Sequence, residues 1–185
     1  MNRFTRIRTA TLGTAIAAAL VMGAAGAATA ESVTIADPAD TSGSLSDIRE
    51  VTAKHTSTKV VVKVGFTELE PASDGGPSSL SVFVDTDRTA KGPEFRLGAG
   101  LQEGADFQLV RVKSWKVVGE PLSCSHSIKL DFEANTARAK LARACLRGPD
   151  EVRVGVKMTD AYDGSHVLVD WLKKPRGFTK WLAAA

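Results

Sequence analysis

The chain has 185 residues, of which 24 are Lys or Arg and 21 are Asp or Glu, so its formal net charge is +3. The excess comes from Arg3, Arg6 and Arg8, because residues 1–30 contain no acidic side chain. Residues 31–185 are therefore formally neutral. This removes the main electrostatic reason to expect nucleic acid or an anionic membrane as a partner.

The first 30 residues are predicted to be a signal peptide. A weakly apolar run, rich in Ala and Gly, follows the three arginines, and Ala28-Thr29-Ala30 then fits the small-residue rule for signal peptidase. We expect cleavage between Ala30 and Glu31, which leaves residues 31–185 as one secreted domain. An uncleaved anchor is the alternative, but this run has few large apolar side chains. No later segment is apolar enough to cross a membrane.

Period-2 alternation dominates the remaining chain and predicts antiparallel strands with one buried face. In residues 59–66, for example, Val60, Val62 and Val64 alternate with lysines. In chain order, the expected strands are 48–53, 59–66, 80–84, 94–97, 106–113, 128–132, 152–158 and 167–171. Residues 136–144 have a helix-like composition but also alternate, and we favour a strand.

Gly- and Pro-rich turns separate these segments, and no long helices alternate with them. Nine or ten strands in this arrangement predict an all-β fold, an antiparallel β-sandwich of the jelly-roll or immunoglobulin-like type.

Cys124 and Cys145 are the only two cysteines. In an oxidising compartment such a pair is most simply a disulfide, and its 20-residue loop corresponds to about 3 kcal/mol in the chain-entropy model. A zinc site or a catalytic thiol is the alternative, but the pair lacks the spacing typical of zinc ligands.

Carboxylates gather in the predicted loops. They form three groups: Asp37, Asp40 and Asp47; Asp85 and Asp87; and Asp160, Asp163 and Asp170. Calcium takes six to eight oxygen ligands, and loops at strand ends can supply them. We therefore consider a calcium site formed by the first two groups and expect no other cofactor. The alternative is that each Asp stabilises its own turn by accepting backbone N–H bonds.

The same residues carry a resemblance to known families. The stretch Asp37-Pro38…Asp40…Gly43…Asp47-Ile48, followed by the strand 59–66, looks like the opening of DOMON-type and family-nine carbohydrate-binding sandwiches. Asp85-Thr86-Asp87 followed by Gly92-Pro93-Glu94-Phe95 resembles a turn of that group. The resemblance implies a sandwich that binds sugars or haem, or that serves as an accessory module.

The chain also resembles a group of uncharacterised secreted proteins from high-GC Gram-positive bacteria. The similar features are Cys145-Leu146-Arg147-Gly148-Pro149 and Asp170-Trp171.

Tyr162 and Trp171 are candidate ligand-binding residues, because sugar rings pack their apolar faces on aromatic side chains. The alternative is that Trp171 and Trp181 pack the C-terminal segment against the sandwich. We expect no catalytic residues, since His55, His126 and His166 lie in unrelated contexts and no hydrolase motif is present.

The expected function is a secreted, non-catalytic binding or structural module whose partner is extracellular polysaccharide or cell-wall material. An inhibitor or interaction partner of secreted enzymes is the second possibility, and a secreted hydrolase is the third. The sequence does not indicate the oligomeric state.

Overall fold

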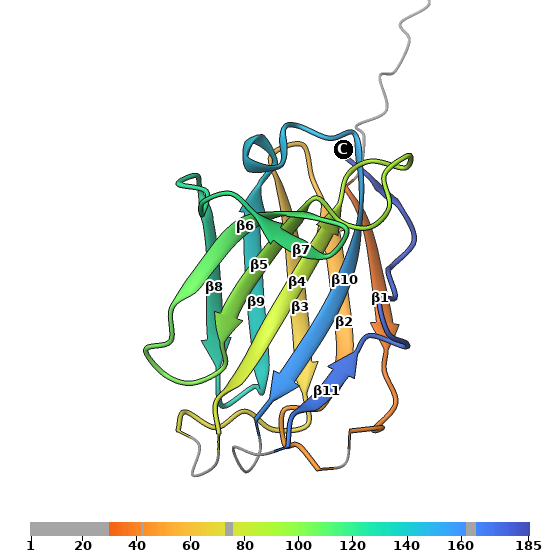
Figure 1. Cartoon of the computed structure of the whole chain (residues 1–185). Helices are drawn as coiled ribbons and strands as arrows, with labels where there is room; N and C mark the ends of the chain where they lie inside the picture. Colours follow the sequence, from red (N-terminus) through yellow and green to blue (C-terminus); the bar gives the residue numbers. More distant parts are fainter. Residues whose placement is uncertain (1–29, 42, 73–75, 162–165) are drawn as a thin grey trace, which may run out of the picture.

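Two antiparallel sheets face each other in the computed structural model, which describes residues 30–41, 43–72, 76–161 and 166–185 (Figure 1). The first sheet has the order β1–β2–β3–β9–β8, with β1 (Glu31–Ala36), β2 (Ile48–His55), β3 (Lys59–Phe66), β9 (Thr136–Ala142) and β8 (His126–Asp131). The second has the order β11–β10–β4–β5–β6–β7, with β11 (Leu168–Trp171), β10 (Glu151–Asp160), β4 (Ser78–Asp85), β5 (Phe95–Gly100), β6 (Phe107–Lys113) and β7 (Lys116–Val118). A further short strand, β12 (Leu182–Ala183), also pairs with β10. The predicted antiparallel β-sandwich is confirmed.

The alternating sequence accounts for the core between the sheets. In β3, Val60, Val62 and Val64 are fully buried, whereas Lys59 and Lys63 are exposed. In β10 the apolar residues from Val152 to Met158 face the same interior. Each strand therefore places one apolar row between the sheets, and antiparallel pairing keeps these rows in register.

The segment whose sequence was ambiguous is a strand for most of its length. β9 lies between β3 and β8, with Ala137, Ala139 and Leu141 buried. The expectation of a strand is confirmed for these residues, and the chain then forms a short 3₁₀ helix, η1 (Arg143–Leu146). Alternation did not reveal β1, β7 and β12, which are short or partly exposed.

Cys124 and Cys145 form a disulfide, as predicted, with their Cα atoms 5.7 Å apart. Cys124 precedes β8, and Cys145 lies in η1, directly after β9. The bridge therefore fastens the open end of the β8–β9 hairpin at the edge of its sheet.

The residues after β11 return across the outer face of the second sheet. Trp115, Trp171 and Phe178 gather around Phe83, with ring centroids 5.0–5.6 Å apart. Arg153 lies over the rings of Phe178 and Trp181 at 4.6 and 4.9 Å. These contacts favour the packing interpretation of the late tryptophans.

The predicted signal peptide lies outside the described residues, except for Ala30. Within the described part of the chain, no helix is long and apolar enough to cross a membrane.

Candidate functional site

The connection between β1 and β2 folds over one end of the sandwich because Asp47 holds it there. Its carboxylate accepts hydrogen bonds from the Thr41 amide (2.9 Å) and the Thr67 hydroxyl (3.2 Å), and it pairs with Arg49 at 3.3 Å. The turn is an example of Asp organising backbone amides. It also fixes the position of Asp40, which precedes Thr41 and is exposed.

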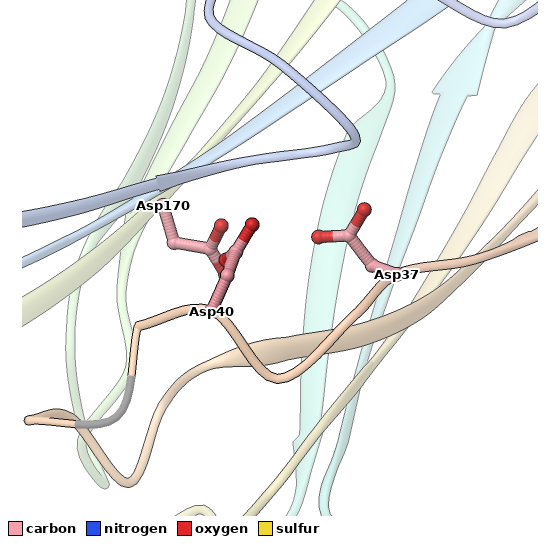
Figure 2. A group of neighbouring side chains, drawn as sticks. All are labelled: Asp37, Asp40 and Asp170. Atoms are coloured by element: carbon pink, nitrogen blue, oxygen red, sulfur yellow. The ribbon is translucent and has the colours of Figure 1, made fainter.

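Three carboxyl groups from distant parts of the sequence meet beside this connection. One oxygen each from Asp37, Asp40 and Asp170 lies within 4.8 Å of the other two. Figure 2 shows the three carboxyl groups turned toward one another, two from the β1–β2 connection and one from β11. We call this group the acidic cluster.

Asp170 reaches the cluster because it lies on the inward face of β11. It pairs with Met158, a fully buried residue of β10, so the two share the face directed at the core. Asp170 is only 2% exposed, and one of its oxygens accepts a hydrogen bond from the Ile48 amide at 2.7 Å. The Asp170 carboxylate thus joins β11 of one sheet to the start of β2 in the other.

Asp37 makes a second link of the same kind. It directly follows β1, is 5% exposed, and accepts a hydrogen bond from the Lys173 amide through Oδ1 at 2.6 Å. Its other oxygen, Oδ2, is buried and has no hydrogen-bond partner among the described residues. A buried carboxylate oxygen without a partner is costly, because burial removes its water and nothing replaces it.

The electrostatics of the cluster show that negative charge is poorly compensated. The pKa of Asp170 is raised to about 6, mainly by burial and also by the charges of Asp37, Asp47 and Asp40, while the hydrogen bond from the Ile48 amide partly opposes the shift. Burial also raises the pKa of Asp37; the Lys173 amide opposes that shift, and the charge of Asp40 adds to it.

The arrangement suits a hard cation. All the donors are carboxylate oxygens, which calcium and magnesium prefer, whereas zinc favours nitrogen and sulfur. The three oxygens lie within 4.8 Å of one another, so one such ion can touch all of them. Calcium tolerates an irregular set of six to eight oxygen ligands, whereas magnesium demands near-ideal octahedral geometry.

The acidic cluster coincides with only part of the calcium-ligand set predicted from the sequence. Asp37 and Asp40 belong to it, and Asp47 supports it from the adjoining turn. Asp85 and Asp87 do not: Asp85 pairs with Arg153 at 2.6 Å, and Asp87 accepts hydrogen bonds from the Thr89 amide and hydroxyl. These contacts are those expected of structural carboxylates.

The sequence analysis did not join Asp170 to the first group. The sequence of this strand could have indicated a buried carboxylate, because alternation puts Asp170 on the same face as Leu168. A charged residue on an otherwise apolar face is unusual and needs a partner.

An open groove of about 280 Å³ adjoins the acidic cluster. It is lined by Asp40, Thr41, Val169, Asp170, Trp171, Lys173, Lys174 and Pro175. Trp171 is partly exposed but stacks on Phe83, with ring centroids 5.6 Å apart. It therefore contributes to packing and also borders the groove. Tyr162, the other candidate aromatic residue, lies outside the described residues.

Two of the histidines lie within hydrogen-bond distance of a backbone carbonyl oxygen. His55 is fully buried, and its Nδ1 lies 3.0 Å from the Leu182 carbonyl oxygen. His126 Nδ1 lies 2.7 Å from the Cys124 carbonyl oxygen.

No protein-family model matches this sequence, and no curated protein matches it either.

Proposed function

We propose that the protein is an exported, non-catalytic binding module that holds a calcium ion in the acidic cluster and takes extracellular carbohydrate as its ligand. The observation that carries the proposal is the convergence of Asp37, Asp40 and Asp170 around a buried carboxylate oxygen to which no described residue donates a hydrogen bond. A cation bound there would supply that partner and compensate the accumulated negative charge.

The burial of these carboxylates supports binding rather than hydrolysis. Glycoside hydrolysis needs two carboxyl groups that flank and touch the scissile bond. Asp37 and Asp170 are each at least 95% buried and accept hydrogen bonds from backbone amides, so their oxygens are directed at the protein. Such groups suit the inner coordination of an ion.

The adjoining groove supports a carbohydrate ligand. Calcium takes six to eight oxygens, so three carboxylates leave coordination positions that ligand hydroxyls can fill. Asp40 is the exposed member of the cluster, and the groove that it lines also contains Trp171. An aromatic edge beside polar groups is a common combination in sugar-binding sites.

Export is supported by two independent features. The chain begins with a basic and then small-residue segment ending in Ala28-Thr29-Ala30, and a disulfide joins Cys124 to Cys145. Disulfides persist mainly in oxidising compartments outside the cytoplasm.

Calorimetric titration of the chelator-treated protein tests the cation site. We expect saturable binding of one Ca²⁺ per chain, weaker binding of Mg²⁺, and at least a tenfold loss of calcium affinity in the variant Asp40→Asn. Asp40 is a suitable target because it is exposed and accepts only a long hydrogen bond, at 3.5 Å from the Thr41 hydroxyl, from the side chains that the structure describes.

Asp106→Asn is the matched control, because Asp106 is an exposed carboxylate outside the acidic cluster. If the protein took up no Ca²⁺, or if the two variants lost affinity equally, the cation site would be refuted.

Sedimentation with insoluble polysaccharides tests the ligand. We expect retention on cell-wall material or a common glucan that chelator abolishes and added calcium restores. Retention on none of them, by protein shown to contain calcium, would remove the carbohydrate ligand and leave the cation site intact.

A further inference from the structure

A second cavity, of about 570 Å³, lies at the end of the sandwich opposite the acidic cluster. Its lining comes from the β4–β5 connection, the adjoining parts of β5, β6 and β7, and Arg147 after η1. Figure 1 shows the β4–β5 connection at the upper end and the β1–β2 connection at the lower end. The volume lies within the range of about 300–1,000 Å³ typical of small-molecule sites. We call it the upper cavity.

Strand register explains why cationic side chains enter this cavity. Arg111 of β6 pairs with Phe95 on one side and with Val118 on the other, so the three share one face. Phe95 is 2% exposed and belongs to the core, so this face is directed toward the opposite sheet. Lys113, two residues farther along β6, lies on the same face where the strand reaches the end of the sandwich.

Four cations line the upper cavity: Lys91, Arg111, Lys113 and Arg147. Each is exposed, and none forms an ion pair, a side-chain hydrogen bond or a cation–π contact with another described residue. Arg88 and Arg153, by contrast, both form ion pairs and lie over aromatic rings. The four cations of the cavity are therefore available to a ligand.

Two carboxylates also line the cavity, and both are committed to neighbouring threonines. Asp87 accepts hydrogen bonds from the amide and hydroxyl of Thr89, and Glu94 accepts them from the amide and hydroxyl of Thr86. Among the described residues, four cations and two carboxylates line the cavity, so this part of the lining has a net excess of two positive charges.

Two tight turns border the cavity in a conformation that costs energy. Ser114 and Trp115, between β6 and β7, have φ values of 51° and 68°, and Arg147 has φ of 66°. Left-handed backbone costs non-glycine residues roughly 1–2 kcal/mol each and is retained where the surroundings require it. At Trp115 the requirement is visible, since its ring packs on Phe83.

At Arg147 no such packing explains the choice of residue. It occupies the position after η1 where glycine is usual, and its amide bonds the Ala144 carbonyl at 3.2 Å. Gly148 follows directly, also with a positive φ. The chain thus keeps an arginine, with its side chain in the cavity lining, where glycine would be less strained.

We propose that the upper cavity binds an oxyanion group, a carboxylate or a phosphate, carried by a ligand of one or two sugar rings in size. Guanidinium groups match the geometry of such oxyanions with two parallel hydrogen bonds, and lysines add positive charge. Pro93, Phe95 and Val112 contribute apolar lining. The site is independent of the acidic cluster, because it shares no residue with it.

An NMR titration in excess chelator tests this site without any contribution from calcium. The probes are digalacturonate for carboxylate, glycerol phosphate for phosphate and maltose as a neutral disaccharide. We expect at least one anion to shift the amide signals of residues 111–118 and 145–148 saturably, with weaker binding at higher salt. We expect maltose to leave these signals unchanged. The anion that binds more tightly identifies the group that the site prefers.

The double variant Arg111→Gln/Lys113→Gln should bind the preferred anion at least tenfold more weakly. Lys129→Gln/Lys140→Gln, which removes two exposed cations from the outer face of the β8–β9 hairpin, should stay within twofold of the wild type. Equal melting temperatures would show that both variants are folded. Saturable shifts by neither anion, equal shifts by maltose, or an equal loss in both variants would each overturn the proposal.

Discussion

Single carboxylates on the inward faces of the strands set the electrostatic behaviour of the lower end. Asp160 and Asp170 both follow apolar rows, and each finds a donor in the other sheet or its connections: the Ser44 hydroxyl of the β1–β2 connection at 2.5 Å for Asp160, and the amide of Ile48, the first residue of β2, at 2.7 Å for Asp170. These hydrogen bonds give each carboxylate a donor, but the donors carry no positive charge to compensate its negative charge. The raised pKa of Asp170 means that ionising this group opposes folding when no cation is present.

The free energy of unfolding of the metal-free protein should therefore respond to pH through Asp170. Its folded pKa of about 6 lies above its ordinary value of 3.8, so the penalty is absent below pH 4 and complete above pH 6. Asp170→Asn removes the charge but keeps an oxygen for the Ile48 amide. In chelator, the wild type should gain on the order of 2 kcal/mol relative to this variant as pH falls from 7 to 4.5. Urea denaturation at both pH values measures the difference, and a difference independent of pH would contradict the assignment.

At the scale of elements, the C-terminal segment stays on the outer face of the second sheet because β10 presents a glycine beneath it. A Cβ atom at Gly155 would lie 2.8 Å from the Gly177 carbonyl oxygen and 3.3 Å from the Phe178 ring. The Thr179 amide bonds the Val154 carbonyl at 2.8 Å, so the segment follows β10 closely. Gly155 is thus needed for a close approach of two backbone segments.

Gly155→Ala should destabilise the fold, by about 1–3 kcal/mol, because backbone and ring must both shift to admit the methyl group. Gly65→Ala is the matched control: Gly65 lies within β3, and the nearest atoms to its added Cβ are 3.9 Å away. Urea denaturation should separate the two variants clearly. Tryptophan fluorescence should also change only in Gly155→Ala, since Trp115 packs on Phe178 at 5.4 Å. Equal stability of both variants would show that the C-terminal segment adjusts freely.

At the scale of the whole molecule, the sequence predicted the features that follow from periodicity and local spacing. It did not predict the contacts that arise only when the two sheets pack together. Alternation in β3 and β10 predicted strands and a sandwich, and the cysteine pair predicted its disulfide. The meeting of Asp37 with Asp170 was not predictable in this way. These residues are 133 positions apart: Asp37 follows β1 of one sheet, and Asp170 lies in β11 of the other. Their meeting requires the β1–β2 connection to cross onto β11.

The upper cavity was missed for the same reason. Arg111 and Arg147 come from β6 and from the turn after η1, and neither has a local motif that points to the other. The sequence analysis did group Asp85 with Asp87, but only because the two residues are neighbours in one turn. Local spacing can show which residue types are available, whereas the pairing of strands decides which of them meet.

Calcium should stabilise the whole sandwich, because the acidic cluster joins both sheets. Asp37 ties the end of β1 to Lys173, and Asp170 ties β11 to the start of β2. An ion that binds only the folded state adds about 2.7 kcal/mol at a free concentration one hundred times its Kd. We expect a higher melting temperature in calcium than in chelator, and a smaller increase in Asp40→Asn, because a tenfold loss of affinity reduces this stabilisation to about 1.4 kcal/mol at the same calcium concentration.

Hydrogen exchange shows where this stabilisation acts. Calcium should slow exchange most at the Thr41, Ile48 and Lys173 amides, each of which donates to a carboxylate of the cluster or of its supporting turn. Amides that exchange by local opening at the upper cavity, such as Arg147, serve as the internal control and should change little. Uniform protection at both ends would mean that calcium acts through global stability alone. Protection confined to the upper cavity would place the ion at the wrong end of the molecule and refute its assignment to Asp37, Asp40 and Asp170.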